Sequence, residues 1–351
     1  MQQNMQQTTF KKLLVTSSPH VGSSLTTRKI MLHVIIALSF PVIAGTVLYG
    51  FYALLVVGLS TAAAVFGEWL FNKIRKKPDT VSDLSAVVTG IILGLNLPPT
   101  VAFYVPIVGG IVATMFVKML FGGLGKNFAN PAATARIFLL LAWGAQMMKY
   151  VNPIDYSAFT VENLFMGFTP DAAYVTSATP LAGIKASAET GAPEFDLLAA
   201  FLGNIGGTIG ETCKLAIILS AVYLLVFRII DWKIPVGYFL SVAVCCLIFY
   251  RQGWNYILPG LMSGGVMFAG VFMLTDYTTS PVSRLGTWIF AVGAGILTVL
   301  IRRFGGMNEG VSFAILLMNL LTPLIDKATK PRPFGYTKPK KAKGEAHESK
   351  N

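Results

Sequence analysis

The feature that most constrains this chain is a series of apolar runs, each long enough to approach the width of a lipid bilayer. A membrane-spanning helix needs about 20 consecutive apolar residues. Such runs occupy approximately residues 30–50, 51–74, 82–98, 101–121, 131–148, 196–228, 235–250, 255–275, 286–301 and 310–325. Only 13% of the 351 residues are charged and 54% are hydrophobic, a surplus that a water-soluble globule of this size cannot bury. The sequence therefore predicts an all-α integral membrane protein with about ten transmembrane helices.

Positive charge gathers at the two ends of the chain. Residues 1–29 contain four basic side chains and no acidic one, and residues 327–351 contain eight basic side chains against two acidic ones. Loop 149–194 instead holds five acidic side chains against two lysines. Cytoplasmic segments of membrane proteins are enriched in Lys and Arg. We therefore predict a cytoplasmic N-terminal segment 1–29, a membrane domain 30–326 whose loop 149–194 lies outside, and a basic cytoplasmic tail 327–351. Basic tails of this kind favour anionic lipid, and no nucleic-acid partner is expected.

A short internal repeat predicts how the spans are arranged. The sequence Phe121-Gly122-Gly123 recurs as Phe304-Gly305-Gly306, at an offset of 183 residues, and residues 89–93 align loosely with 269–273 at an offset of 180. Five spans separate the copies, and an odd number reverses the second copy in the membrane. The sequence thus predicts two inverted repeats of five helices, a design common among membrane transport folds. Chance similarity is the alternative. The repeat would place Lys118 inside and its counterparts Arg302 and Arg303 outside.

Two polar segments interrupt the apolar pattern at membrane depth. One runs from Asn204 to Glu211 and contains Gly206, Gly207 and Gly210, and the other runs from Asn127 to Arg136. Non-helical backbone at this depth is stable only where protein or a cavity surrounds it. We therefore expect both segments to meet and to line a polar route through the membrane. The residues predicted to line this route are Asn127, Asn130, Arg136, Asn204 and Glu211.

The same segments have a structural interpretation. A helix beginning near Thr208 would direct its positive end into the route, but the glycines would equally permit tight helix crossing. Arg136 and Glu211 would then form a structural pair. The other ionisable residues within the apolar runs include Glu68 and Lys214, which could extend toward an interface, and Asp276 and Glu309.

No metal centre is expected. The three histidines, His20, His33 and His347, have no ligand spacing with one another, and the chain has no Cys-x-x-Cys pair and no nucleotide-binding glycine loop.

The outer loop contains the sharpest short motif, Thr176-Ser177-Ala178-Thr179, followed by Pro180. One interpretation is an ordinary hydroxyl-rich loop. The other follows from a resemblance to the Ser/Thr-x-Ala-Thr pattern at which membrane flavoproteins carry FMN. That resemblance implies a phosphoester bond between Thr179 and FMN, with Thr176, Ser177 and Ala178 forming the rest of the motif that a flavin transferase meets.

Further segments resemble the D subunit of the Rnf ferredoxin:NAD⁺ oxidoreductase complex, whose sister family is the B subunit of the sodium-translocating NADH:quinone reductase. The segments that carry the resemblance are residues 17–21, 26–32, 125–136, 179–181 and 206–212. Together they are specific, although each is short, and the resemblance extends over roughly residues 17–335.

The resemblance implies an electron-transfer membrane subunit in a prokaryotic plasma membrane. Its complex would couple ferredoxin oxidation and NAD⁺ reduction to the translocation of Na⁺ or H⁺. The implied cofactors are FMN on Thr179 and, by analogy with the sister family, a second, non-covalent flavin such as riboflavin. The implied partners are a second flavinylated subunit, small iron–sulfur-bridging membrane subunits and a cytoplasmic iron–sulfur subunit.

The alternative is a solute or ion channel or transporter. Such a protein would have the same inverted-repeat fold and no redox cofactor.

Overall fold

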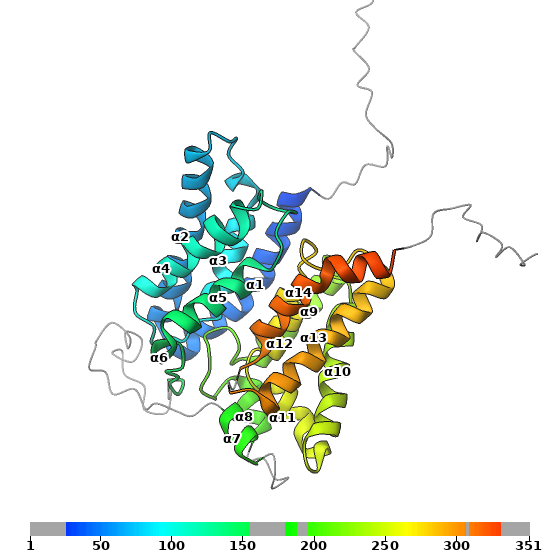
Figure 1. The fold of residues 1–351 in the computed structure, drawn as a ribbon. Coiled ribbons are helices and arrows are strands. Elements are labelled where there is room, and N and C mark those ends of the chain that lie inside the picture. Colours follow the sequence, from blue (N-terminus) through cyan, green and yellow to red (C-terminus); the bar gives the residue numbers. More distant parts are fainter. Residues whose placement is uncertain (1–25, 155–179, 188–194, 307–308, 331–351) are drawn as a thin grey trace, which may run out of the picture.

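Helices account for all the regular secondary structure in the part of the chain that the computed structural model describes, which is residues 26–154, 180–187, 195–306 and 309–330. Figure 1 shows them as a bundle in which the start of α1 (Thr27–Tyr49) and the end of α14 (Val311–Ala328) lie toward one end, whereas α7 (Pro180–Ala186) lies at the other.

The first group of helices lies on the N-terminal side of loop 149–194. It comprises α1, α2 (Phe51–Ile74), η1 (Val81–Asp83), α3 (Ser85–Leu95), α4 (Tyr104–Ile111), which continues as the π-helical η2 (Val112–Met119), α5 (Pro131–Ala142) and α6 (Gly144–Met147).

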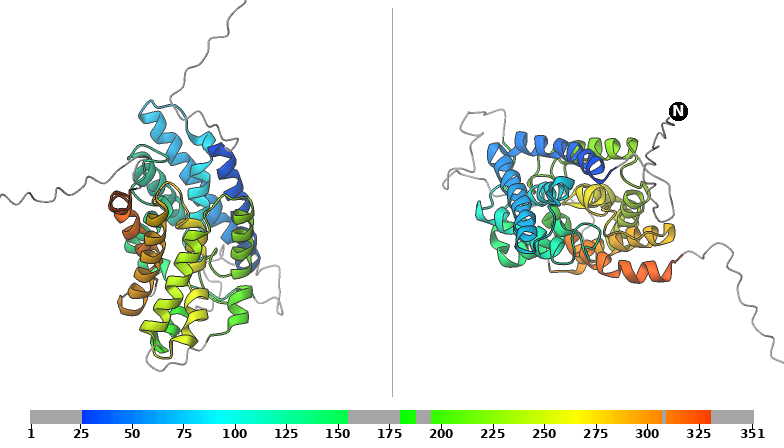
Figure 2. Two further views of the ribbon diagram at one scale, coloured as in Figure 1. Left: turned by 90° about the vertical axis from the view of Figure 1, so that its right-hand side faces the viewer. Right: turned by 90° about the horizontal axis from the view of Figure 1, so that it is seen from above.

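The second group follows α7. It comprises α8 (Leu197–Leu202), α9 (Lys214–Val226), α10 (Lys233–Phe249), η6 (Gly253–Tyr256), α11 (Ile257–Met262), α12 (Val266–Phe268), the π-helical η7 (Ala269–Met273), α13 (Arg284–Phe304) and α14. Seen from above, the two groups stand side by side (Figure 2), and they touch through α1 with α9 and through α5 with α14.

Fewer helices cross the full width of a bilayer unbroken than the sequence predicts. Among the described residues, α1, α2, α13 and α14 are long and apolar enough to span, and residues 253–273 form a fifth candidate bent by 65°. The run 82–98 contains only the 11-residue helix α3. It ends before Pro98 and Pro99, because proline lacks the N–H that would continue a helix. The run 196–228 breaks at Gly203, whose φ of +100° ends α8 in a conformation that favours glycine.

Small residues let α2, α3 and α4 approach closely. A Cβ added at Gly90 of α3 would lie 2.5 Å from the Cα of Thr61, and one added at Gly110 of α4 would lie 2.6 Å from the carbonyl oxygen of Ser60. The Ser60 hydroxyl donates a 2.9 Å hydrogen bond to the Gly90 carbonyl. Close backbone contact between small residues is the usual way in which helices associate in lipid.

Two residue pairs at one constant spacing are buried at both positions. Thr114 and Thr298, 184 positions apart, are both fully buried, and their hydroxyls donate to the carbonyls of Gly110 and Ala294, at 3.0 and 2.8 Å. Lys118 and Arg302 share this spacing. Both are buried, because each cation finds acceptors inside the bundle.

The Lys118 ammonium contacts Glu68 Oε2 at 2.6 Å and the Ser85 hydroxyl at 2.5 Å. Glu68, which the sequence allowed at an interface, is fully buried in this ion pair. Arg302 donates to the carbonyls of Gly260 and Ser263, at 3.0 and 3.1 Å.

The Glu68–Lys118 pair predicts a stability effect. Replacing Lys118 with Met should destabilise the folded chain by about 3–5 kcal/mol, because the Glu68 charge would stay buried without its partner. The double variant Glu68→Gln/Lys118→Met should recover much of that loss. Thermal unfolding in detergent measures both, and Lys77→Met, at an exposed lysine, is the control. Equal midpoints for the single and double variants would contradict the prediction.

Candidate functional site

A cluster of charged side chains lies where the helix breaks meet. It is formed by Arg136 of α5, Glu211 in the break between α8 and α9, Lys214 at the start of α9, Arg302 of α13 and Glu309 just before α14. Glu309 is 15% exposed, and the other four side chains are nearly or completely buried. We call these five residues the central charge cluster.

Arg136 is the member that touches the most elements. Asn130 caps α5 by accepting hydrogen bonds from the backbone N–H groups of Ala132 and Ala133, which starts the helix just before Arg136. The Arg136 guanidinium donates to Asn96 Oδ1, at the end of α3, at 3.0 Å, and to Glu309 Oε2 at 3.0 Å. Arg136 therefore joins α5 to α3 and to the start of α14.

Glu309 is the carboxylate held most firmly. Its Oε1 accepts a 3.1 Å hydrogen bond from the backbone N–H of Gly265, and Arg302 approaches the same oxygen to 3.7 Å. The expected pair between Arg136 and Glu211 is present at 4.0 Å but is longer than the Arg136–Glu309 contact. The structure thus makes Glu309 the principal partner of Arg136.

Glu211 is held by the broken backbone around it. Its Oε1 accepts from the Thr208 N–H at 3.2 Å. The N–H groups of Ile209 and Gly210 donate to the carbonyls of Leu97 and Leu95, at 3.1 and 2.7 Å. These bonds to the end of α3 correct the expectation of a helix beginning near Thr208, since the backbone there pairs with another segment and α9 begins only at Lys214.

Lys214 also differs from the sequence expectation. Its side chain is fully buried and does not reach an interface. The ammonium donates to the backbone carbonyls of Glu211 and of Gly264, the latter at 3.3 Å. Lys214 therefore ties the break before α9 to the break between α11 and α12.

The central charge cluster has one positive charge in excess, with three cations against two carboxylates. Several buried polar atoms beside it have no hydrogen-bond partner within the described residues: Glu211 Oε2, Thr208 Oγ1, Thr212 Oγ1, Ser263 Oγ and Arg302 Nε. Burying such groups without partners is costly, and bound water or an ion is the usual way of satisfying them. The arrangement is therefore suited to holding water or a mobile charge between the helix breaks.

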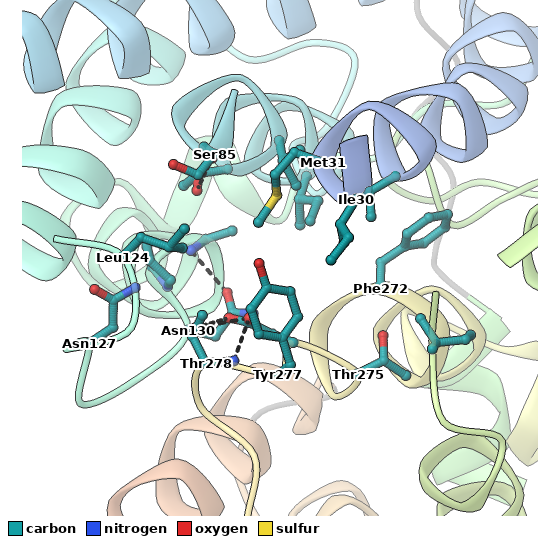
Figure 3. A pocket seen from close by; sticks show the side chains of 18 of the residues that line it. Ile30, Met31, Ser85, Leu124, Asn127, Asn130, Phe272, Thr275, Tyr277 and Thr278 are labelled. Atoms are coloured by element: carbon teal, nitrogen blue, oxygen red, sulfur yellow. Dashed lines mark hydrogen bonds between the residues drawn. The ribbon is translucent and has the colours of Figure 1, made fainter. Parts of the chain in front are cut away.

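A separate pocket lies between α1, α3, α5, α9 and the residues after η7. It is a cavity of about 80 Å³ that opens to solvent. Apolar side chains such as Met31 and Phe272 line one wall, and Asn127 and Asn130 lie near the start of α5 (Figure 3). The Asn127 side-chain oxygen is buried without a partner among the described residues, and Asn130 donates to the Met273 carbonyl at 3.1 Å. We call this cavity the α1–α5 pocket.

The five residues predicted to share one route are therefore divided. Arg136 and Glu211 meet in the central charge cluster, whereas Asn127 and Asn130 line the α1–α5 pocket. Asn204 is exposed and belongs to neither, because the chain turns at Gly203 and directs the following residue outward.

The sequence analysis missed Asn96 and gave Lys118 and Arg302 no role inside the bundle. The signal for Asn96 was present, since an amide directly before Leu97-Pro98-Pro99 marks a helix that ends inside an apolar run. The motif Thr176–Thr179 lies outside the described residues. Within them, no group of three or more His, Cys, Asp or Glu side chains is placed to hold a metal ion.

Comparison with known proteins assigns the chain to a family. Residues 14–335 match the NQR2, RnfD, RnfE family. The chain is 42% identical to the D subunit of the Na⁺-translocating ferredoxin:NAD⁺ oxidoreductase complex of Acetobacterium woodii, covering 94% of this chain and 97% of that protein. It is 38% identical to the D subunit of the proton-translocating ferredoxin:NAD⁺ oxidoreductase complex of Clostridium ljungdahlii, covering 92% and 96%. It is 35% identical to the D subunit of the ion-translocating oxidoreductase complex of Actinobacillus succinogenes, covering 92% and 98%. The chain belongs to the NQR2, RnfD, RnfE family.

Proposed function

We propose that this chain is an electron-transfer membrane subunit of an ion-translocating ferredoxin:NAD⁺ oxidoreductase complex. The observation that carries the proposal is 42% identity over nearly the full length of both chains to a relative with that name. The chain would act only as part of the complex. Its partners would be a second flavinylated subunit, small iron–sulfur-bridging membrane subunits and a cytoplasmic iron–sulfur subunit, together with membrane lipid. The two relatives named above for a specific ion differ in that ion, so the proposal covers both Na⁺ and H⁺.

The fold proposed for this role has about ten membrane segments, several of them broken, in two inverted repeats. The matched environments of Thr114 with Thr298 support it, as do the matched positions of Lys118 and Arg302. In Figure 1 both described chain ends lie toward the same end of the bundle, which supports a common side for the termini. We assign that side to the cytoplasm of a prokaryotic cell.

Covalent FMN on Thr179 is the proposed outer redox group, and a bound flavin supplies one- or two-electron transfer. Thr179 directly precedes α7, whose residues Leu181 and Ile184 are buried. Lys185 of α7 donates a 2.5 Å hydrogen bond to the Gly305 carbonyl at the end of α13. These contacts hold α7, the helix that follows Thr179 in the sequence, against the end of α13.

The α1–α5 pocket is the proposed site for the second, non-covalent flavin such as riboflavin. The lining matches the chemistry of a flavin ring because it combines apolar walls with amide groups. Met31 and Phe272 would pack against the ring, and the unpartnered Asn127 oxygen would accept a hydrogen bond from its polar edge. Arg136 and Glu211, deeper in the bundle, would line the path of the coupling ion.

The first test concerns FMN. Thr179→Ala should yield a folded chain without covalent flavin, because only the hydroxyl that forms the phosphoester is removed. Intact-mass spectrometry and in-gel fluorescence measure the loss, and Thr190→Ala, in the same loop but outside the motif, is the control expected to retain the flavin. A parent chain without any flavin would favour the redox-free transporter instead.

The second test concerns orientation. Gly183, on exposed α7, has open space where a Cβ would stand, and Lys77 is exposed near the other end of the bundle. A membrane-impermeant thiol reagent should label Gly183→Cys in intact cells but label Lys77→Cys only after the membrane is opened. The parent, with its own three cysteines, gives the background. The reverse labelling pattern would contradict the proposed orientation.

The third test concerns Glu211. Glu211→Gln keeps the shape and the Thr208 contact but removes the charge. We expect normal assembly and FMN loading with about tenfold lower ion transport, the effect of losing a charged hydrogen-bond partner. Asp231→Asn, at an exposed carboxylate, is the control. Transport at the parent rate in Glu211→Gln would make Glu211 a structural residue.

A further inference from the structure

Asn319 of α14 is a buried polar residue that the proposed function leaves without a task. Its side chain is only 2% exposed, yet neither its amide nitrogen nor its carbonyl oxygen has a hydrogen-bond partner among the described residues. A primary amide buried in this way loses both its donor and its acceptor bonds to water, at a cost of several kcal/mol. Such a group points to something that binds there.

Asn319 belongs to a polar line along the inward face of α14. Ser312, seven residues earlier and therefore on the same helix face, is 4% exposed, and its hydroxyl also has no partner in the described part of the chain. Thr322, one turn after Asn319, donates its hydroxyl to the Thr279 carbonyl at 3.1 Å. We call Ser312, Asn319 and Thr322 the α14 track.

The α14 track starts at the central charge cluster. Ser312 lines a small enclosed cavity together with Arg136 and Glu309. From Ser312 to Thr322 the helix rises about 15 Å, which is about half the hydrocarbon thickness of a bilayer. The track thus leads from the buried charges toward the end of the bundle at which α14 finishes (Figure 1).

The internal repeat gives Asn319 a counterpart. At the 183-residue offset of the two Phe-Gly-Gly motifs, Asn319 corresponds to Arg136. At this offset, buried Pro131, Ala132, Ala135 and Arg136 of α5 correspond to buried Ala314, Ile315, Met318 and Asn319 of α14, whereas buried Ala133, Ile137 and Leu139 have no buried counterpart.

One half of the molecule therefore holds a tethered cation at this position, bonded to Asn96 and Glu309. The other half holds a shorter, neutral amide whose oxygen has no partner among the described residues. A carbonyl oxygen and a hydroxyl oxygen are good ligands for a hard monovalent cation, and water bound to that cation can accept from the amide N–H.

We propose that Asn319 binds the coupling cation, as Na⁺ with water or as a proton carried on water, and that the α14 track is its passage to and from the central charge cluster. The inference rests on the proposed ion-translocating role. Neutral ligands suit a passage, because they solvate the cation without trapping it as a buried carboxylate would.

The test uses the whole complex in proteoliposomes, driven by reduced ferredoxin and NAD⁺. ²²Na⁺ uptake and quenching of a pH-sensitive dye distinguish the two forms of the cation. Asn319→Leu, which removes the oxygen, and Asn319→Lys, which places a tethered cation there as in Arg136, should each lower transport about tenfold or more. Asn319→Ser, which keeps an oxygen, should transport at least several-fold faster than the Leu variant. Met318→Leu, at the adjacent buried position, is the matched control and should behave as the parent does.

Two readouts separate this inference from the proposed function. Covalent FMN content and the reduction of bound flavin by reduced ferredoxin in detergent should be unchanged in every Asn319 variant. If the parent itself lacks flavin, the proposed function fails, independently of Asn319. Parent-level transport in both the Leu and the Lys variants would overturn the passage. Loss of assembly in all three variants would also overturn the passage, because Asn319 would then be a packing residue.

Discussion

The contacts of the Arg136 guanidinium hold the interrupted helices of this protein together. Helices that stop inside a bilayer expose backbone groups and capping side chains that water cannot reach, so each end needs a partner from another segment. Arg136 supplies one by bonding Asn96 at the end of α3 and Glu309 at the start of α14. Glu309 in turn accepts from the Gly265 N–H, so one cation connects three helix ends.

The other breaks are satisfied by backbone and by Lys214. Ile209 and Gly210 donate to the end of α3, and the Lys214 ammonium reaches carbonyls in two separate breaks. These contacts leave some charged groups and polar atoms of the described residues without a full set of partners. Within the described residues, the centre holds one more cation than carboxylate, and Glu211 Oε2 has no hydrogen-bond partner. A protein that moves charge needs polar groups of this kind, which are not fully committed to one another.

The two halves use equivalent positions differently. Lys118 is neutralised by Glu68 in a direct ion pair, whereas Arg302 bonds backbone carbonyls and lies 3.7 Å from Glu309. In the proposed repeat, the two equivalent buried cations therefore differ in whether a carboxylate or backbone carbonyls are the main partner. The α1–α5 pocket and the central charge cluster are separate sites, so the proposed flavin and the proposed ion path need not compete for the same groups.

The sequence by itself determined that the chain is helical and lies in a membrane, because apolar runs of this length have no other stable environment. It also located the break in the run 196–228, where α8 ends at Gly203 just before the glycine-rich segment 204–211. The bend within 253–273 was not predicted. The family followed from motifs spread along the chain, which the family match over residues 14–335 confirms.

The tertiary structure alone decided which charges meet. Asn204 and Glu211 are seven residues apart, yet one is exposed and the other is buried beside Arg136. Lys118 and Arg302 face inward only because acceptors from distant segments surround them. Partners brought together by folding from distant parts of the chain leave no local signature, and this is why the site needed the structure.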